Sequence, residues 1–174
     1  MTKLINLFQH NVAKKILFIE AMLDDIDSDY FIAKIEQGIL EKNNNSYKTQ
    51  LQGEMTYWEF FNEDPIFRKM LKKALECNPV NYNNYRLIES WGFKINRNEH
   101  TNLHQHSCSF SGIFYLNDCK TELIFPELNI GIIPKKNKFV FFSGFLEHGT
   151  KKLDDDVKYG ISFNILDVQA KNND

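Results

Sequence analysis

The second half of the chain consists of short, strand-like segments, and this pattern constrains the fold more than any other feature. Each segment is rich in β-branched or aromatic residues, and Asn, Asp, Gly or Pro residues separate it from the next. The candidate strands are Tyr85–Ile95, Leu103–His106, Phe110–Leu116, Glu122–Phe125, Ile130–Ile133, Lys138–Phe142 and Lys158–Ile165. Short strands in such close succession predict a β-sandwich or a barrel.

The first half has a different pattern, which predicts helices. Asp27 or Ser28 can cap one helix, and Asp64 followed by Pro65 marks the start of another. Apolar residues recur every three or four positions after each start, as on one face of a helix. The apolar segment from Val12 to Met22 fits either a strand or a helix.

These two halves predict one α+β domain. The chain has 174 residues, which suffice for one domain and are few for two. We expect helical support over about residues 1–80 and a β core over about residues 81–166.

Composition and charge argue against several classes of function. The formal net charge is −2, which disfavours a dedicated nucleic-acid-binding protein. No apolar run reaches the ~18 residues of a membrane span, and the first residues lack the apolar core of a signal peptide. Because Cys77, Cys108 and Cys119 are odd in number and widely spaced, we expect reduced thiols and a cytoplasmic location.

Two histidines separated by one residue predict a metal site. Because side chains alternate along a strand, His104 and His106 are expected to point to the same face. His148 follows the apolar strand Lys138–Phe142 and can supply a third imidazole, leaving coordination positions open for substrate. The alternative is a chance polar pair on a half-exposed strand.

The last predicted strand carries a cation and a hydroxyl on one face. Period two places Lys158, Gly160, Ser162 and Asn164 together, opposite an apolar set. A cation and a hydroxyl beside a metal suit a ligand that bears a carboxylate. The alternative is that Lys158 starts an edge strand and that water solvates its amine.

Five segments, in this order, resemble the iron(II)- and 2-oxoglutarate-dependent oxygenase superfamily: HQH, SGIFYLN, TELIFPE, KFVFFSGFLEHG and KYGISFN. The similarity is greatest to the prolyl-hydroxylase-like branch and to small bacterial and phage members. It implies a double-stranded β-helix (jelly-roll or cupin-like) core with supporting N-terminal helices. It also implies Fe(II) and the cosubstrate 2-oxoglutarate, with molecular oxygen hydroxylating an unidentified small molecule or protein side chain.

The resemblance assigns roles to individual residues. His104 matches the first metal-ligating histidine and His148 the distal one. Lys158 stands where the family has the Arg or Lys that pairs with the far carboxylate of 2-oxoglutarate, and Ser162 and Tyr115 match positions that support that carboxylate. His106 departs from the pattern, because most members have Asp or Glu as this ligand.

Other functions remain open from the sequence. A cupin-type metalloprotein would also have an HxH pair, but its further Glu ligand would fall where Phe110 and Ser111 stand. A zinc enzyme with three histidines would leave Lys158 without a role. A non-catalytic domain that binds 2-oxoglutarate is the third alternative. The oligomeric state is also open, with a homodimer among the possibilities.

Overall fold

A computed structural model describes residues 3–10, 16–24, 26–41, 49–76 and 84–168. Within these ranges the chain forms helices α1 (Ser28–Glu41) and α2 (Pro65–Leu75) and twelve strands. None of the described helices is both long and apolar enough to cross a membrane. The predicted α+β class is therefore confirmed, with strands in the majority.

The main sheet has seven strands and is antiparallel throughout. In spatial order its strands are β1 (Lys3–His10), β2 (Ile16–Met22), β10 (Lys138–Ser143), β7 (Phe110–Tyr115), β12 (Val157–Asp167), β5 (Tyr85–Asn96) and β4 (Glu54–Met55). The long strands β5 and β12 pair over most of their length. This sheet is the base on which the functional site is built.

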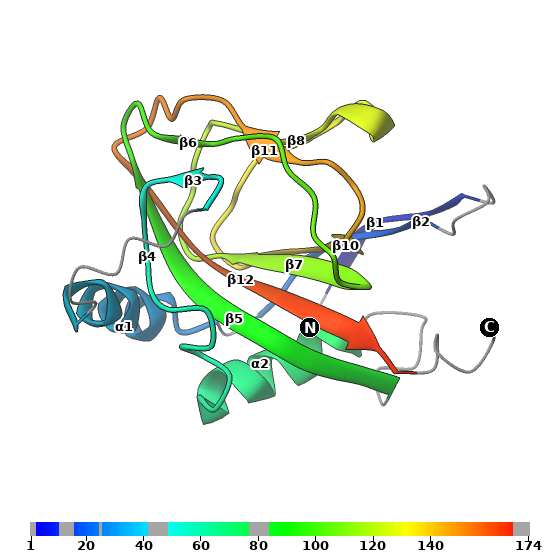
Figure 1. The fold of residues 1–174 in the computed structure, drawn as a ribbon, viewed down its shortest axis with the longest axis horizontal. Helices are drawn as coiled ribbons and strands as arrows, with labels where there is room; N and C mark the ends of the chain where they lie inside the picture. Colours follow the sequence, from blue (N-terminus) through cyan, green and yellow to red (C-terminus); the bar gives the residue numbers. More distant parts are fainter. Residues whose placement is uncertain (1–2, 11–15, 25, 42–48, 77–83, 169–174) are drawn as a thin grey trace.

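Two smaller sheets lie across from it. One contains β11 (Gly149–Thr150), β8 (Leu123–Phe125) and β9 (Ile130–Ile132), with a 3-10 helix, η2 (Pro126–Leu128), between the last two in sequence; the other pairs β3 (Leu51–Gln52) with β6 (His100–Thr101). Figure 1 shows these short strands on one side of the main sheet and both α-helices on the other. The predicted jelly-roll core with supporting helices is confirmed.

The helices cover one face of the main sheet with an aromatic core. Asp64 caps α2 by accepting hydrogen bonds from the backbone N–H groups of Ile66 and Phe67. The Phe67 ring then packs against Phe114 of β7 and Phe163 of β12, at centroid distances of 6.1 and 6.3 Å. The apolar set of β12 thus faces the helices, which turns its polar set toward the small sheets.

Strands β1 and β2 depart from the helical support that we predicted over about residues 1–80. β1 pairs antiparallel with β2, and β2 pairs with β10 in the main sheet. Five consecutive residues of β2 are buried, because the strand is covered on both faces. A strand of this kind has a continuous apolar sequence rather than an alternating one, so periodicity could not separate it from a helix.

Candidate metal centre

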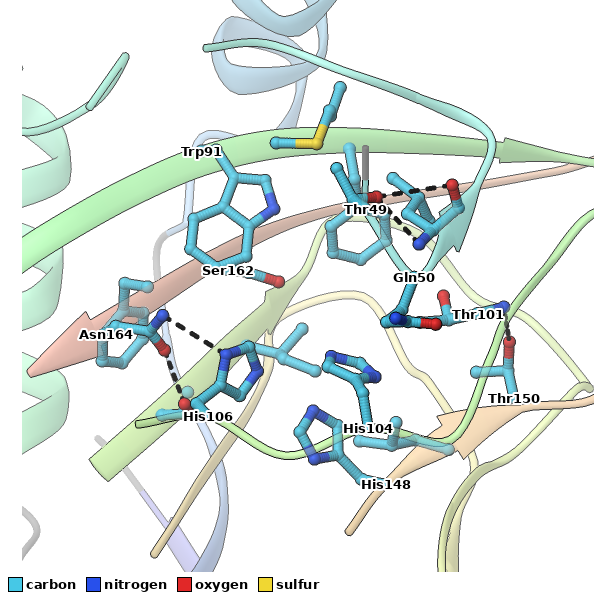
Figure 2. Close-up of a pocket in the computed structure, with 18 of the residues that line it drawn as sticks. Thr49, Gln50, Trp91, Thr101, His104, His106, His148, Thr150, Ser162 and Asn164 are labelled. Atoms are coloured by element: carbon cyan, nitrogen blue, oxygen red, sulfur yellow. Dashed lines mark hydrogen bonds between the residues drawn. The ribbon is translucent and has the colours of Figure 1, made fainter. Parts of the chain in front are cut away.

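Three histidines converge in the cavity between the main sheet and the small sheets (Figure 2). One ring nitrogen from each of His104, His106 and His148 lies within 4.8 Å of the others. His148 is buried, and the other two are half-buried. Three imidazole nitrogens at this separation can bind one divalent ion and leave coordination positions open.

The backbone fixes two of these histidines against each other. The N–H of His104 donates to the carbonyl of His148 at 3.0 Å, and the N–H of His148 donates back at 2.9 Å. The predicted strand Leu103–His106 is wrong in extent, because His104 alone forms a bridge. The pairing stops there because the opposite chain turns, with the N–H of Leu146 donating to Ser143.

The expected common orientation of the pair nevertheless holds. Exposure alternates along this segment, because Leu103 and Gln105 are exposed while His104 and His106 line the cavity. The N–H of His106 is held by the carbonyl of Gly144 at 2.8 Å rather than by a strand partner. The alternation of side chains that we predicted from the sequence is therefore present even though the segment is not a regular strand.

The other ring nitrogens define the tautomers of two histidines. Nδ1 of His104 lies 2.9 Å from the carbonyl oxygen of Asn102, and Nδ1 of His148 lies 2.9 Å from that of Leu146. A carbonyl only accepts hydrogen bonds, so each Nδ1 carries the hydrogen and each Nε2 lone pair is free. Backbone carbonyls commonly orient metal-binding imidazoles in this way.

Burial keeps two of the imidazoles neutral. It lowers the pKa of His106 to about 4 and, together with the nearby His104, lowers the pKa of His148 to about 3. A protonated imidazole cannot ligate a metal. At neutral pH both rings are therefore uncharged, which metal binding requires.

Lys158 brings a buried cation to the same cavity. It lies on β12, between β7 and β5, so the alternative of a solvated lysine on an edge strand is wrong. Only 2% of the residue is exposed, and burial lowers its pKa to about 8. Within the described part of the chain, its ammonium has no hydrogen-bond or ion-pair partner. Such a group is suited to an anionic ligand.

The remaining predicted site residues line this cavity too. Tyr115 is almost fully buried, which raises the pKa of its hydroxyl, and Ser162 is half-buried on the same face of β12 as Lys158. Thus all six residues singled out from the sequence surround one cavity of about 250 Å³.

The structure adds lining residues that sequence reasoning missed. Ser111 lies on the same face of β7 as Tyr115, four residues earlier, so period-two alternation would have found it. Trp58 comes from the segment before α2 and packs against Trp91 at 4.8 Å between ring centroids. No local pattern in the sequence points to Trp58.

Comparison with known proteins identifies the fold. No family model and no curated protein matches the sequence. Among solved structures, the chain is similar to the viral collagen prolyl hydroxylase of Paramecium Bursaria Chlorella virus-1 in complex with 2-oxoglutarate. The TM-score is 0.66 at 18% identity, covering 85% of this chain and 94% of that one.

Two bacterial structures are also similar. A prolyl-4-hydroxylase of Pseudomonas putida gives a TM-score of 0.63 at 13% identity, over 84% of this chain and 91% of that one. HygX of Streptomyces hygroscopicus, with nickel and 2-oxoglutarate bound, gives 0.59 at 13% identity, over 85% and 82%. At these identities the likeness concerns the fold. The chain has the double-stranded β-helix fold of the iron(II)- and 2-oxoglutarate-dependent oxygenases.

Proposed function

We propose that this protein is an iron(II)- and 2-oxoglutarate-dependent oxygenase that hydroxylates a small molecule or a protein side chain. One observation carries the proposal: a cluster of three imidazole nitrogens and a buried ammonium without a protein partner among the described residues line the same cavity. A three-histidine zinc hydrolase would need the first feature and leave the second unexplained.

The residues fit both groups. His104, His106 and His148 would hold the iron, and an imidazole that ligates a metal contributes no negative charge. The centre would keep the full double charge of Fe(II), which favours a dianionic cosubstrate. Lys158 would bind the far carboxylate of 2-oxoglutarate, with the hydroxyls of Ser162 and Tyr115 as supporting groups. When bound, iron and 2-oxoglutarate supply the oxidation of a C–H bond by oxygen, with release of succinate and carbon dioxide.

The residues of the chain would bind the cosubstrate, orient the metal ligands and shield the cavity from water. The Lys158 ammonium positions the cosubstrate, and the carbonyls of Asn102 and Leu146 orient two imidazoles. Apolar and aromatic walls, which include Trp58 and Trp91, exclude water from the cavity. HygX and the viral hydroxylase, which share the fold, were solved with 2-oxoglutarate, which supports the assignment of this cosubstrate.

We place the protein in the cytoplasm. The two cysteines within the described residues, Cys108 and Cys119, are free thiols, which supports a reducing compartment. The third, Cys77, lies outside those residues.

Anaerobic loading tests the function directly. Addition of Fe(II) and 2-oxoglutarate should produce a weak visible absorption band, because the keto acid chelates the metal through its carboxylate and keto oxygens. Admission of oxygen should then release succinate, faster when the true substrate is present. His148→Ala should abolish both signals, since it removes the buried ligand. A protein that binds iron and 2-oxoglutarate and forms no succinate would be a binding domain, and the enzyme assignment would be wrong.

Zinc is the matched control for this experiment. Zn²⁺ has a filled d shell and no redox chemistry, so it gives neither the band nor succinate in the same site. Wild-type protein that retains zinc and hydrolyses a substrate, with no response to 2-oxoglutarate, would support the competing zinc assignment.

A further inference from the structure

A hydrogen-bonded network contacts His106 and has no part in the function proposed so far. Asn164 of β12 is at its centre, buried beside the cavity (Figure 2). The Ser111 hydroxyl donates to Oδ1 of Asn164 at 2.5 Å, and Nδ2 of Asn164 donates to Oε1 of Glu89 at 2.6 Å. The same Nδ2 lies 3.4 Å from Nδ1 of His106.

These partners determine the orientation of the Asn164 amide. A carboxylate only accepts hydrogen bonds, so Glu89 requires the NH₂ end of the amide. Ser111 donates to the opposite end. The NH₂ group therefore also faces Nδ1 of His106, which must accept, and the ring hydrogen of His106 then lies on Nε2.

The tautomer of His106 is thereby the opposite of that of His104 and His148. The carbonyls beside His104 and His148 hold the hydrogen on Nδ1 and leave Nε2 free. The amide beside His106 engages Nδ1 and so holds the hydrogen on Nε2, the one nitrogen of this ring that remains for a metal. Two of the rings therefore present a free Nε2 lone pair to a metal, whereas the third carries a hydrogen on Nε2.

We propose that Asn164 is a positioning residue that makes His106 a conditional ligand. His106 joins the metal only when the Asn164 amide turns over and presents Oδ1 to an Nδ1–H. Glu89 opposes that turn, because the turned amide would bring Oδ1 against its carboxylate oxygen. The proposal rests on the metal site of the proposed function. It assigns a role to the departure of His106 from the carboxylate ligand of the superfamily.

The negative charge of Glu89, considered alone, predicts the opposite effect on metal affinity. If Glu89 acted only as a nearby anion, it would attract the metal, and its neutralisation would weaken binding. In the network, Glu89→Gln replaces an acceptor by an amide that can donate to the turned Oδ1. This variant should therefore bind Zn²⁺ more tightly, by about tenfold, the lower end of effects seen for groups that orient metal-binding histidines.

Imidazole nitrogen–proton NMR with histidine-labelled protein tests the proposal, and diamagnetic Zn²⁺ is the probe. In metal-free wild type near neutral pH, His106 should carry its hydrogen on Nε2, and His104 and His148 on Nδ1. Zn²⁺ should bring all three to the Nδ1–H form. Asn164→Asp should place the His106 hydrogen on Nδ1 without metal, because a carboxylate only accepts.

Two results would overturn the inference: an Nδ1–H form of His106 in the metal-free wild type, or unchanged or weaker Zn²⁺ binding in Glu89→Gln. Glu147→Gln, which neutralises a half-buried carboxylate next to His148, is the matched control and should not tighten binding. Failure of the proposed function is a separate result. In that case Zn²⁺ shifts no ring signal in the wild type, while the metal-free spectrum still decides the tautomer of His106.

Discussion

At the scale of single residues, the Lys158 ammonium combines burial with a charge. Burial lowers its pKa to about 8, and the nearby Cys119 and Asp155 offset only part of this effect. A carboxylate bound in the cavity would supply the missing counter-charge and stabilise the protonated form. The free site is therefore electrostatically incomplete, and we expect a bound carboxylate ligand to complete it.

Lys158→Ala should lose about 1.5–3 kcal/mol of 2-oxoglutarate binding free energy, the scale of a hydrogen bond to a charged group. Metal binding should be nearly unchanged, because Lys158 is not among the clustered ligands. Isothermal titration of the metal-loaded protein measures both quantities. Lys152→Ala, which removes an exposed lysine from a nearby loop, is the control. Equal affinity in all three proteins would show that another group binds the carboxylate.

The lowered pKa of Lys158 also predicts a pH dependence. As pH rises through about 8, the free site loses its proton, so 2-oxoglutarate affinity should fall. Lys158→Arg keeps its charge throughout this range and should flatten the profile. The comparison is made by titrating 2-oxoglutarate into both metal-loaded proteins across neutral to alkaline pH. A wild-type profile as flat as that of the arginine variant would contradict the assignment.

At the scale of elements, the predictions succeeded where one local signal decides the structure. The Asp64–Pro65 pair marks the start of α2, and alternation along Lys158–Ile165 selects the residues of β12 that face the cavity. The sequence left β2 open between strand and helix, because a strand that is covered on both faces lacks the alternation that would identify it. The prediction failed for Leu103–His106, where pairing ends because of a turn some forty residues away in sequence.

Asp64 joins the two helices and gives a test at this scale. Its carboxylate caps α2 and also accepts hydrogen bonds from Lys34 and from the Tyr30 hydroxyl of α1. Asp64→Ala should lower the free energy of unfolding by about 2–4 kcal/mol, from lost capping and buried polar groups left without an acceptor. Asp64→Asn keeps an acceptor oxygen and should cost about half as much. Urea unfolding measures the free energy of unfolding of each variant, and Glu63→Ala, which changes an exposed neighbour, is the control. If the Asp64 variants lose no more stability than this control, Asp64 does not link the two helices.

At the scale of the whole molecule, the two faces of the main sheet each carry a hydrophobic cluster, and only one of them carries the cavity. The helix-covered face packs one aromatic cluster, while the opposite face packs a second one, some of whose members, such as Phe93 and Phe142, also line the cavity. Substitutions such as Lys158→Ala change only the cavity face. The fold should therefore tolerate changes of the polar residues that line the cavity.

Acid should destabilise the metal-free protein through its buried histidines. The unfolded chain takes up protons at His106 and His148 as pH falls below about 6.5, whereas the folded protein resists until about 4 and 3. The unfolded state binds more protons in that range, so stability falls by up to ~1.4 kcal/mol per pH unit for each histidine. His148→Gln should remove one such contribution. Urea unfolding with a chelator at several pH values measures the slope, and an unchanged slope in the variant would refute this origin.

The reciprocal backbone bonds between His104 and His148 have a consequence for assembly. They already close the loop of chain that runs from one histidine to the other, so the entropy of bringing these ends together is spent during folding. Metal binding would then add a cross-link to a loop that is already closed, so it would not have to supply the entropy of closing that loop. In this respect we expect the chain to differ from small zinc domains that are unfolded without metal. Two of the three candidate ligands, His104 and His148, would already be held together in the apoprotein before an ion arrives.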